Sequence, residues 1–162
     1  MVKNNKGFSL VEFIVVIGII AIVTSAAFYG FGYLSMADCK KCASRINSGL
    51  STARSQTMKN VQPVHMFLYR YDGDYYIKYD ENDTITKDTD AEKIGNGKVT
   101  VTVNAVGGTS STILQDGSDP VKITISRKDG HYISGPQSIT VSADGVTKEI
   151  YLVTDTGKHF VR

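Results

Sequence analysis

The sequence predicts an α+β protein in which one long N-terminal helix packs against a C-terminal antiparallel β domain. Three observations predict this fold class. No charged residue occurs from Phe13 to Ala37, apolar residues then continue at helical spacing, and short alternating strands follow Pro63. The 162 residues suffice for one modest domain and an anchor. We expect a leader at 1–7, a transmembrane helix at 8–34, its amphipathic continuation at 35–62 and the β domain at 63–162.

The first segment of the chain is short, polar and basic, and it precedes a long apolar run. From Phe13 to Leu34 the 22 residues are uncharged and mostly apolar, which suffices for one membrane-spanning helix at about 1.5 Å rise per residue. Lys3 and Lys6 precede this run, so the positive-inside rule leaves residues 1–7 in the cytoplasm. We therefore expect a single-pass protein of the cytoplasmic membrane with its C-terminal domain outside.

Glu12 is an acidic residue at the start of this apolar run. A carboxylate at membrane depth costs about 2.5–3.5 kcal/mol and therefore needs a partner or a function. Cleavage between Gly7 and Phe8 would create a new α-amino cation at Phe8, which could meet Glu12 of the same helix or of an adjacent subunit. A plain signal anchor and a secretory signal peptide cleaved near Ala27 remain alternatives, but both leave Glu12 unexplained.

The stretch Lys6-Gly7-Phe8-Ser9-Leu10-Val11-Glu12, followed by the apolar run, resembles the type IV pilin and pseudopilin superfamily. The resemblance implies the pilin fold, cleavage after Gly7 by a prepilin peptidase and N-methylation of Phe8. It also implies that Glu12 neutralises the N-terminal amine of a neighbouring subunit during assembly. The expected partners are other pilins, the peptidase, and an inner-membrane platform with its ATPase, and the assembled filament would lie at the cell surface.

The helix is predicted to continue beyond the apolar run as an amphipathic segment. Apolar or small residues recur every three or four positions, at Met36, Cys39, Ala43, Ile46, Leu50, Ala53 and Thr57. Such a stripe can lie against a sheet while charged residues face solvent. Asn60 and Pro63 bracket its expected end, because the residue before a proline disfavours the helical conformation.

The remainder of the chain is predicted to form antiparallel strands. Residues 64–71 and 75–79 flank Asp72-Gly73, which is a strong hairpin signal, and five tyrosines in this hairpin are expected to pair across the strands. Residues 80–97 are expected to form an exposed loop. Further strands are expected at 98–103, 121–125, 138–141, 148–153 and 159–161.

Parts of this layout resemble the GspH/FimT-type minor pilins. The resemblance covers Ile46–Gln56, Val61–Met66 and the C-terminal strands from Ser138 to the Gly157-Lys158 turn, whereas residues 80–120 show none. It implies a low-abundance subunit that primes or caps a filament of a type IV pilus or a type II secretion-like system.

Chemistry of other kinds finds little support in the sequence. The histidines at 65, 131 and 159 are scattered, with no catalytic spacing and no phosphate-binding loop, so we expect neither an enzyme nor a cofactor. Cys39 and Cys42 are expected to be packing residues or a local disulfide. The acidic stretch 80–92 lacks the EF-hand spacing, so a solvated loop is favoured over a calcium site.

The charge of the chain bears on nucleic-acid binding. Of the 18 basic residues, removal of residues 1–7 takes Lys3 and Lys6, which leaves 16 basic against 16 acidic side chains. A neutral mature protein argues against strong DNA binding. Some FimT-type proteins bind DNA through their C-terminal region, so a DNA-uptake pseudopilin remains an alternative. Its candidate DNA contacts are Arg127, Lys128, Lys158 and Arg162.

Overall fold

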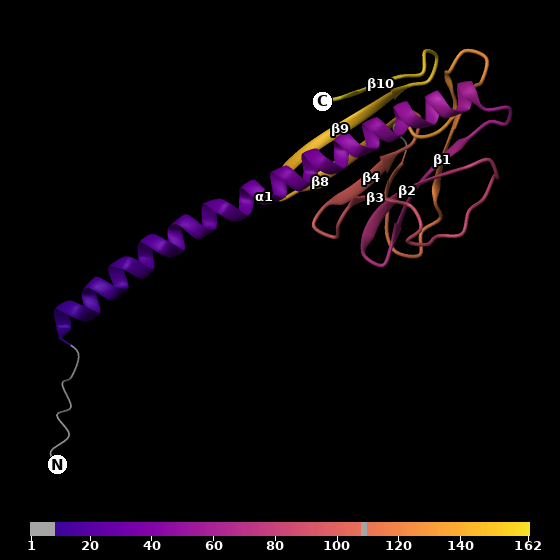
Figure 1. Ribbon diagram of the computed structural model, residues 1–162. Helices are drawn as coiled ribbons and strands as arrows, with labels where there is room; N and C mark the ends of the chain where they lie inside the picture. Colours follow the sequence, from indigo (N-terminus) through magenta and orange to yellow (C-terminus); the bar gives the residue numbers. More distant parts are fainter. Residues whose placement is uncertain (1–8, 108–109) are drawn as a thin grey trace. The chain divides into compact units, whose positions relative to one another are not determined.

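The structure is a computed structural model that describes residues 9–107 and 110–162, with no side chains described at 26–33. The chain divides into two compact units, Met1–Leu34 and Ser35–Arg162. One helix, α1 (Leu10–Lys59), begins in the first unit and ends in the second (Figure 1). Within the described residues, no helix is both long enough and apolar enough to cross a membrane. The membrane-spanning assignment of residues 8–34 stays a prediction.

In the described part of the second unit, ten strands form two five-stranded sheets, and every strand pair is antiparallel. The first sheet has the order β3-β2-β1-β6-β7 and the second has the order β10-β9-β8-β4-β5. The strands are β1 (His65–Tyr71), β2 (Asp74–Asp80), β3 (Glu92–Gly95), β4 (Thr100–Asn104), β5 (Ser111–Ile113), β6 (Val121–Ile125), β7 (Tyr132–Ser134), β8 (Ser138–Ala143), β9 (Val146–Val153) and β10 (Lys158–Val161). The predicted α+β class is therefore confirmed.

The second half of α1 packs against both sheets through the predicted stripe (Figure 1). Six members of that stripe are at most 1% exposed: Cys39, Ala43, Ile46, Leu50, Ala53 and Thr57. They share one continuous core with apolar side chains of both sheets, among them Ile77 of β2 and Ile139 of β8. The helix ends four residues before Pro63, and the Thr57 hydroxyl donates to the Val64 carbonyl oxygen at 2.9 Å, which ties the helix end to the first strand.

The predicted Asp72-Gly73 hairpin is confirmed. Both residues have positive φ, 50° and 78°, as a two-residue turn of this kind requires, and they join β1 to β2. Tyr69 pairs with Tyr76 across the strands, and their rings stack with centroids 5.8 Å apart. This pair confirms the expected cross-strand aromatic pairing for two of the five tyrosines. The other three lie opposite residues that are not aromatic: Tyr71 opposite Asp74, Tyr75 opposite Arg70 and Tyr79 opposite Met66.

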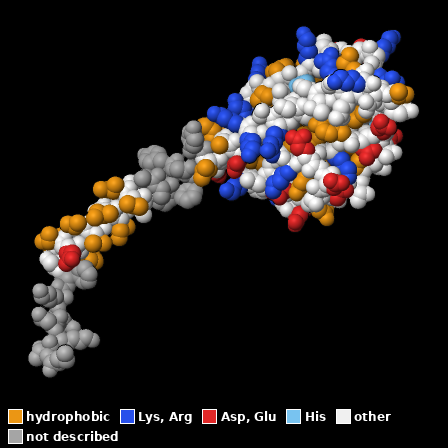
Figure 2. Space-filling model, in the orientation of Figure 1, with side chains coloured by type: hydrophobic (Ala, Val, Ile, Leu, Met, Phe, Trp, Pro, Cys, Tyr) orange, Lys and Arg blue, Asp and Glu red, His pale blue; other side chains and the backbone are white. Residues whose placement is uncertain are grey.

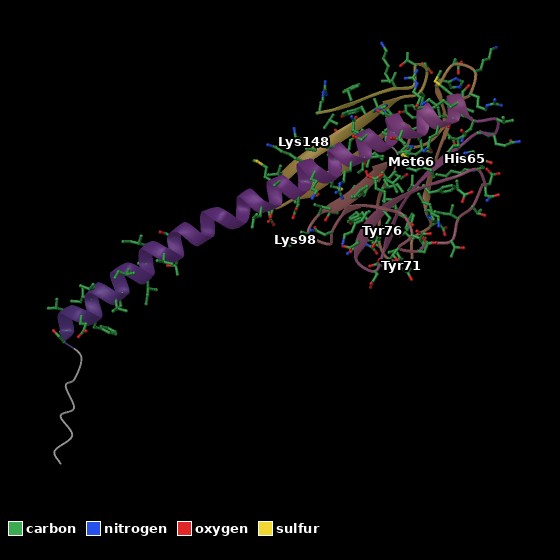
Figure 3. The ribbon with its side chains drawn as sticks, viewed as in Figure 1. His65, Met66, Tyr71, Tyr76, Lys98 and Lys148 are labelled. Atoms are coloured by element: carbon green, nitrogen blue, oxygen red, sulfur yellow. The ribbon has the colours of Figure 1, made fainter. Side chains whose placement is uncertain are left out.

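The first sheet is covered on both faces. Met66 belongs to the main core beside α1, whereas Tyr76 belongs to a second, smaller cluster with Phe67 and Tyr69 (Figure 3). Ile85 and Ala91 of the 81–91 segment pack on this second cluster. A segment that looked solvated in the sequence thus supplies a cover for the outer face of the sheet.

The prediction of an exposed loop over the whole of 80–97 is wrong in its last part. Residues Glu92–Gly95 form β3, which pairs with β2 through a register shift between Tyr75 and Tyr76. Ile94 is 1% exposed and enters the main core. Because a single buried residue carries the strand, no alternation marks it in the sequence. The strands β5 and β7 were also missed, because each has only three residues, with none buried in β5 and one buried in β7.

Candidate functional site

The beginning of α1 is an apolar surface that carries one acid. From Leu10 to Ser25 every residue is exposed, including Leu10 at 75%, Phe13 at 63% and Val23 at 62%. Figure 2 shows hydrophobic side chains over this part of the chain. A helix that is apolar all round and bare must be covered by lipid or by other protein chains. This segment is therefore an interaction surface.

Glu12 lies in the first turn of α1 and is exposed. The turn is closed by the Phe13 amide, which donates to the Ser9 carbonyl oxygen at 3.1 Å. A carboxylate in the first turn interacts favourably with the positive end of the helix dipole. The predicted cleavage and methylation residues, Gly7 and Phe8, lie outside the described residues. Their contact with Glu12 stays a prediction.

Comparison with known families places a recognised motif on this segment. Residues 2–28 match the family model of the prokaryotic N-terminal methylation motif. The match indicates prepilin-type processing and supports a pilin-like subunit. No curated protein and no solved structure matches the chain. The match covers most of the predicted leader and the first part of α1.

The four candidate DNA-contacting residues lie on two parts of the β domain. Arg127 and Lys128 are exposed in the turn between β6 and β7, and Lys158 is exposed at the start of β10. The structure brings these two turns together, because a Cβ atom on Gly157 would stand 1.8 Å from the Gly130 carbonyl oxygen. Arg162 lies apart, beyond the other end of β10, with its guanidinium carbon 5.6 Å from the centroid of the Tyr151 ring.

Arg54 of α1 adds a further cation beneath the two turns. Its guanidinium donates to the Gly157 carbonyl oxygen at 3.2 Å and lies against Gly130. Two exposed acids, Asp129 and Asp155, lie in the same two turns. Hydrogen bonds from Ser126 and His131 lower the pKa of Asp129 to about 2, so the Asp129 carboxylate is charged at neutral pH. The sequence did not indicate Arg54, because its side chain joins the turns only through the packing of α1 on the β domain.

Cys39 and Cys42 are free thiols in the core. The Cys39 thiol donates to the Val141 carbonyl oxygen at 3.3 Å. Burial raises the pKa of Cys42 to about 12, with a further contribution from the neighbouring Cys39. A thiol held protonated in this way is a poor nucleophile and a poor metal ligand. The packing alternative is therefore the one that the structure supports.

The acidic segment 80–92 uses its carboxylates in local contacts. Asp83 accepts from Lys122 at 3.0 Å, Asp88 pairs with Lys78 at 2.7 Å, and Asp80 accepts from the backbone and side chain of Asn82. In the part of the chain that the structure describes, no group of three or more His, Cys, Asp or Glu residues is placed to hold a metal ion. These ion pairs hold the segment over the outer face of the first sheet.

Proposed function

We propose that this chain is the precursor of a minor pilin or pseudopilin of the GspH/FimT type, with a structural role and no catalytic activity. The observation that carries the proposal is Glu12, a carboxylate in the first turn of a bare apolar helix, inside the matched methylation motif. The order of a basic leader, an acid and an apolar helix suits insertion, trimming and lateral assembly. The helix of each subunit would form the filament core, and the β domain would face outward.

The proposed mechanism depends on one charge pair. The precursor inserts in the cytoplasmic membrane with residues 1–7 inside, and a prepilin peptidase cleaves between Gly7 and Phe8. The new Phe8 amine, which is then methylated, neutralises Glu12 of the same or a neighbouring subunit. This pairing offsets the cost of about 2.5–3.5 kcal/mol for a carboxylate at membrane depth and sets the axial register. Extraction from the membrane is driven by the ATPase of the assembly platform, and the subunit ends in a filament at the cell surface.

Two measurements test this function. Mass spectrometry of the native protein should find Phe8, carrying an N-methyl group, as the first residue in cells with an active prepilin peptidase. An N-terminus near Ala27, or the intact residues 1–7, would refute the proposed processing. Glu12→Gln should be processed normally yet enter filaments at least tenfold less efficiently, since the amine loses its partner. Glu81→Gln, which removes an exposed carboxylate from the β domain, is the matched control and should assemble like the wild type.

A second candidate function is DNA binding within a DNA-uptake apparatus. It is favoured by the contact between the two turns that carry Arg127, Lys128 and Lys158, with Arg54 beneath them. Arg127→Gln/Lys128→Gln should weaken binding of the full chain to duplex DNA and reduce the slope of log Kd against log salt by about 2. An affinity that does not change with salt, or equal weakening by Lys41→Gln/Arg45→Gln, would rule out this site.

A further inference from the structure

A cationic cavity lies where α1 meets β3. It measures about 430 Å³ and is lined by Lys41 and Arg45 of α1, Lys93 and Gly95 of β3, and the polar residues Asp38 and Asn96. It is separate from the turns that carry Arg127 and Lys128. Three cations therefore converge from two elements on one concave surface, opposed by a single carboxylate among the lining residues.

Contacts with β2 and β3 hold two of these three cations in place. The Arg45 guanidinium donates to the Lys93 carbonyl oxygen, and the Lys93 ammonium pairs with Asp74. Lys41 precedes Arg45 by four residues, so both side chains lie on the same face of α1. Lys41 is exposed and makes no ion pair with any residue that the structure describes. The cavity thus has one anchored guanidinium and one ammonium still available for a ligand.

Further lysines increase the positive charge around this stretch of α1. Lys98 and Lys148 are labelled in Figure 3. The backbone amide of Lys98 donates to the side-chain oxygen of Asn96 at 3.1 Å, and Lys148 lies close enough to Cys39 to influence the pKa of its thiol. Lys148 therefore adds a cation close to α1, and Lys98 follows the lining residue Asn96 by two positions.

The chemistry of these side chains selects a phosphate-bearing ligand. Guanidinium and ammonium groups donate several charge-assisted hydrogen bonds to phosphate oxygens. Asp38 adds one acceptor, which suits a ligand that also carries hydroxyl groups. A phosphoglycerol headgroup combines these features, because one phosphate meets the cations and its glycerol hydroxyls can donate to the carboxylate.

The position of the cavity along the chain identifies the source of that phosphate. Lys41 follows Leu34, the last residue of the predicted membrane span, by seven residues. Long Lys and Arg side chains close to the end of a span extend into the headgroup layer of the bilayer. We propose that the cavity binds the headgroup of an anionic phosphoglycerol lipid and holds the β domain at the membrane surface before assembly. The inference rests on the proposed function, since it requires residues 8–34 to span the membrane.

Native mass spectrometry of the full chain, purified in a mild non-ionic detergent, tests the inference. Phosphatidylglycerol should bind at least tenfold more tightly than phosphatidylcholine. Lys41→Gln/Arg45→Gln should weaken phosphatidylglycerol binding about tenfold. Arg127→Gln/Lys128→Gln removes the same two charges elsewhere and should leave it unchanged. Equal weakening by both variants, or no weakening by either, would overturn the proposal.

Two further experiments distinguish lipid binding from an effect on folding and from binding of a soluble anion. Lys41→Gln alone removes a side chain without an ion pair, so it should lower lipid binding without changing the melting temperature. Inorganic phosphate at millimolar concentration should not displace the lipid, and full displacement would assign the cavity to a soluble anion instead.

Alkaline carbonate extraction of cell membranes tests whether the chain is anchored in the membrane. Release of the wild-type chain would refute the membrane-anchored precursor, whereas a retained chain without lipid preference would refute this inference alone.

Discussion

The phenolic oxygen of Tyr132 lies 2.8 Å from Nδ1 of His159, so one hydrogen bond joins β7 of the first sheet to β10 of the second. The other ring nitrogen of His159 lies 3.0 Å from the Ser51 hydroxyl of α1. One half-buried imidazole therefore connects the helix and both sheets near the C-terminus. This arrangement has a consequence for stability in acid.

The stability of the β domain should fall with pH through this histidine. Burial, with a contribution from the nearby Arg54, lowers the pKa of His159 below its ordinary value of 6.5. The unfolded chain then binds a proton more readily than the folded chain, so the stabilisation is complete above about pH 6.5 and is lost as pH falls through the lower folded pKa. Thermal unfolding of the full chain between pH 7.5 and 5 should show this loss, and His159→Gln should reduce it.

A parallel pH dependence in the wild type and in His159→Gln would assign the loss to other groups. The aspartates with lowered pKa values do not contribute to the loss of stability between pH 7.5 and 5. Asp80, Asp83 and Asp129 titrate below the ordinary aspartate value of 3.8, so their contributions disappear only at lower pH.

Gly157→Ala should destabilise the protein by more than about 2 kcal/mol. Gly157 has φ of +63°, and an added Cβ would stand 1.8 Å from the carbonyl oxygen of Gly130, which is a backbone atom that no rotamer change can move. Gly145→Ala is the matched control, because its φ is +80° but nothing lies within 4 Å of its Cβ position. The control should cost only the strain of the left-handed backbone, about 1–2 kcal/mol. Denaturant unfolding measures the free energy of unfolding of both variants. Equal losses of stability would show that the two turns can move apart to make room for the added methyl group.

Gly95→Ala should destabilise by about 1–3 kcal/mol through overpacking. The added Cβ would lie 2.9 Å from the Cys42 sulfur and 3.2 Å from a Val99 methyl group. In the Cys42→Ala background the sulfur is absent, so the same substitution should cost about 1 kcal/mol less. A double-mutant cycle of unfolding free energies gives this coupling. Strict additivity would mean that β3 moves away from α1 when the methyl group is added.

The two thiols should be unreactive in the folded chain. With the pKa of Cys42 raised to about 12, only about one molecule in 10⁴ carries the thiolate at pH 8. A thiol reagent should therefore modify neither Cys39 nor Cys42 until denaturant is added, and then both. Fast reaction of the native protein, or an oxidised pair in its intact mass, would contradict the buried free thiols.

Much of the fold could be predicted from local patterns. The stripe from Cys39 to Thr57 is visible at helical spacing, because one face of this part of α1 is buried against the sheets. The Asp72-Gly73 hairpin could be predicted because its two turn residues are typical of a turn with positive φ. The strands β6, β8, β9 and β10 could be predicted from alternating apolar residues or from the turn residues next to them. The N-terminal motif was equally readable, since its chemistry lies in consecutive residues from Lys6 to Glu12.

The candidate sites were less predictable. Of the four proposed DNA contacts, the structure groups Arg127, Lys128 and Lys158 on adjoining turns and leaves Arg162 apart. No spacing along the chain could reveal this grouping, because it depends on how closely Gly130 and Gly157 approach. The cavity of Lys41, Arg45 and Lys93 was missed for a similar reason, since Lys93 belongs to a segment that was expected to be a loop.

The sequence by itself thus determined the helix, most of the strands and the processing motif, because each of these is a regular pattern within a short run of residues. The folded chain alone determined the strands β3, β5 and β7, the contact of the two cationic turns, and the cavity beside β3. These features depend on pairing and packing between segments far apart in sequence. Such contacts stabilise the protein only once the segments have come together in the fold. The sequence of any one segment therefore shows no pattern that predicts them.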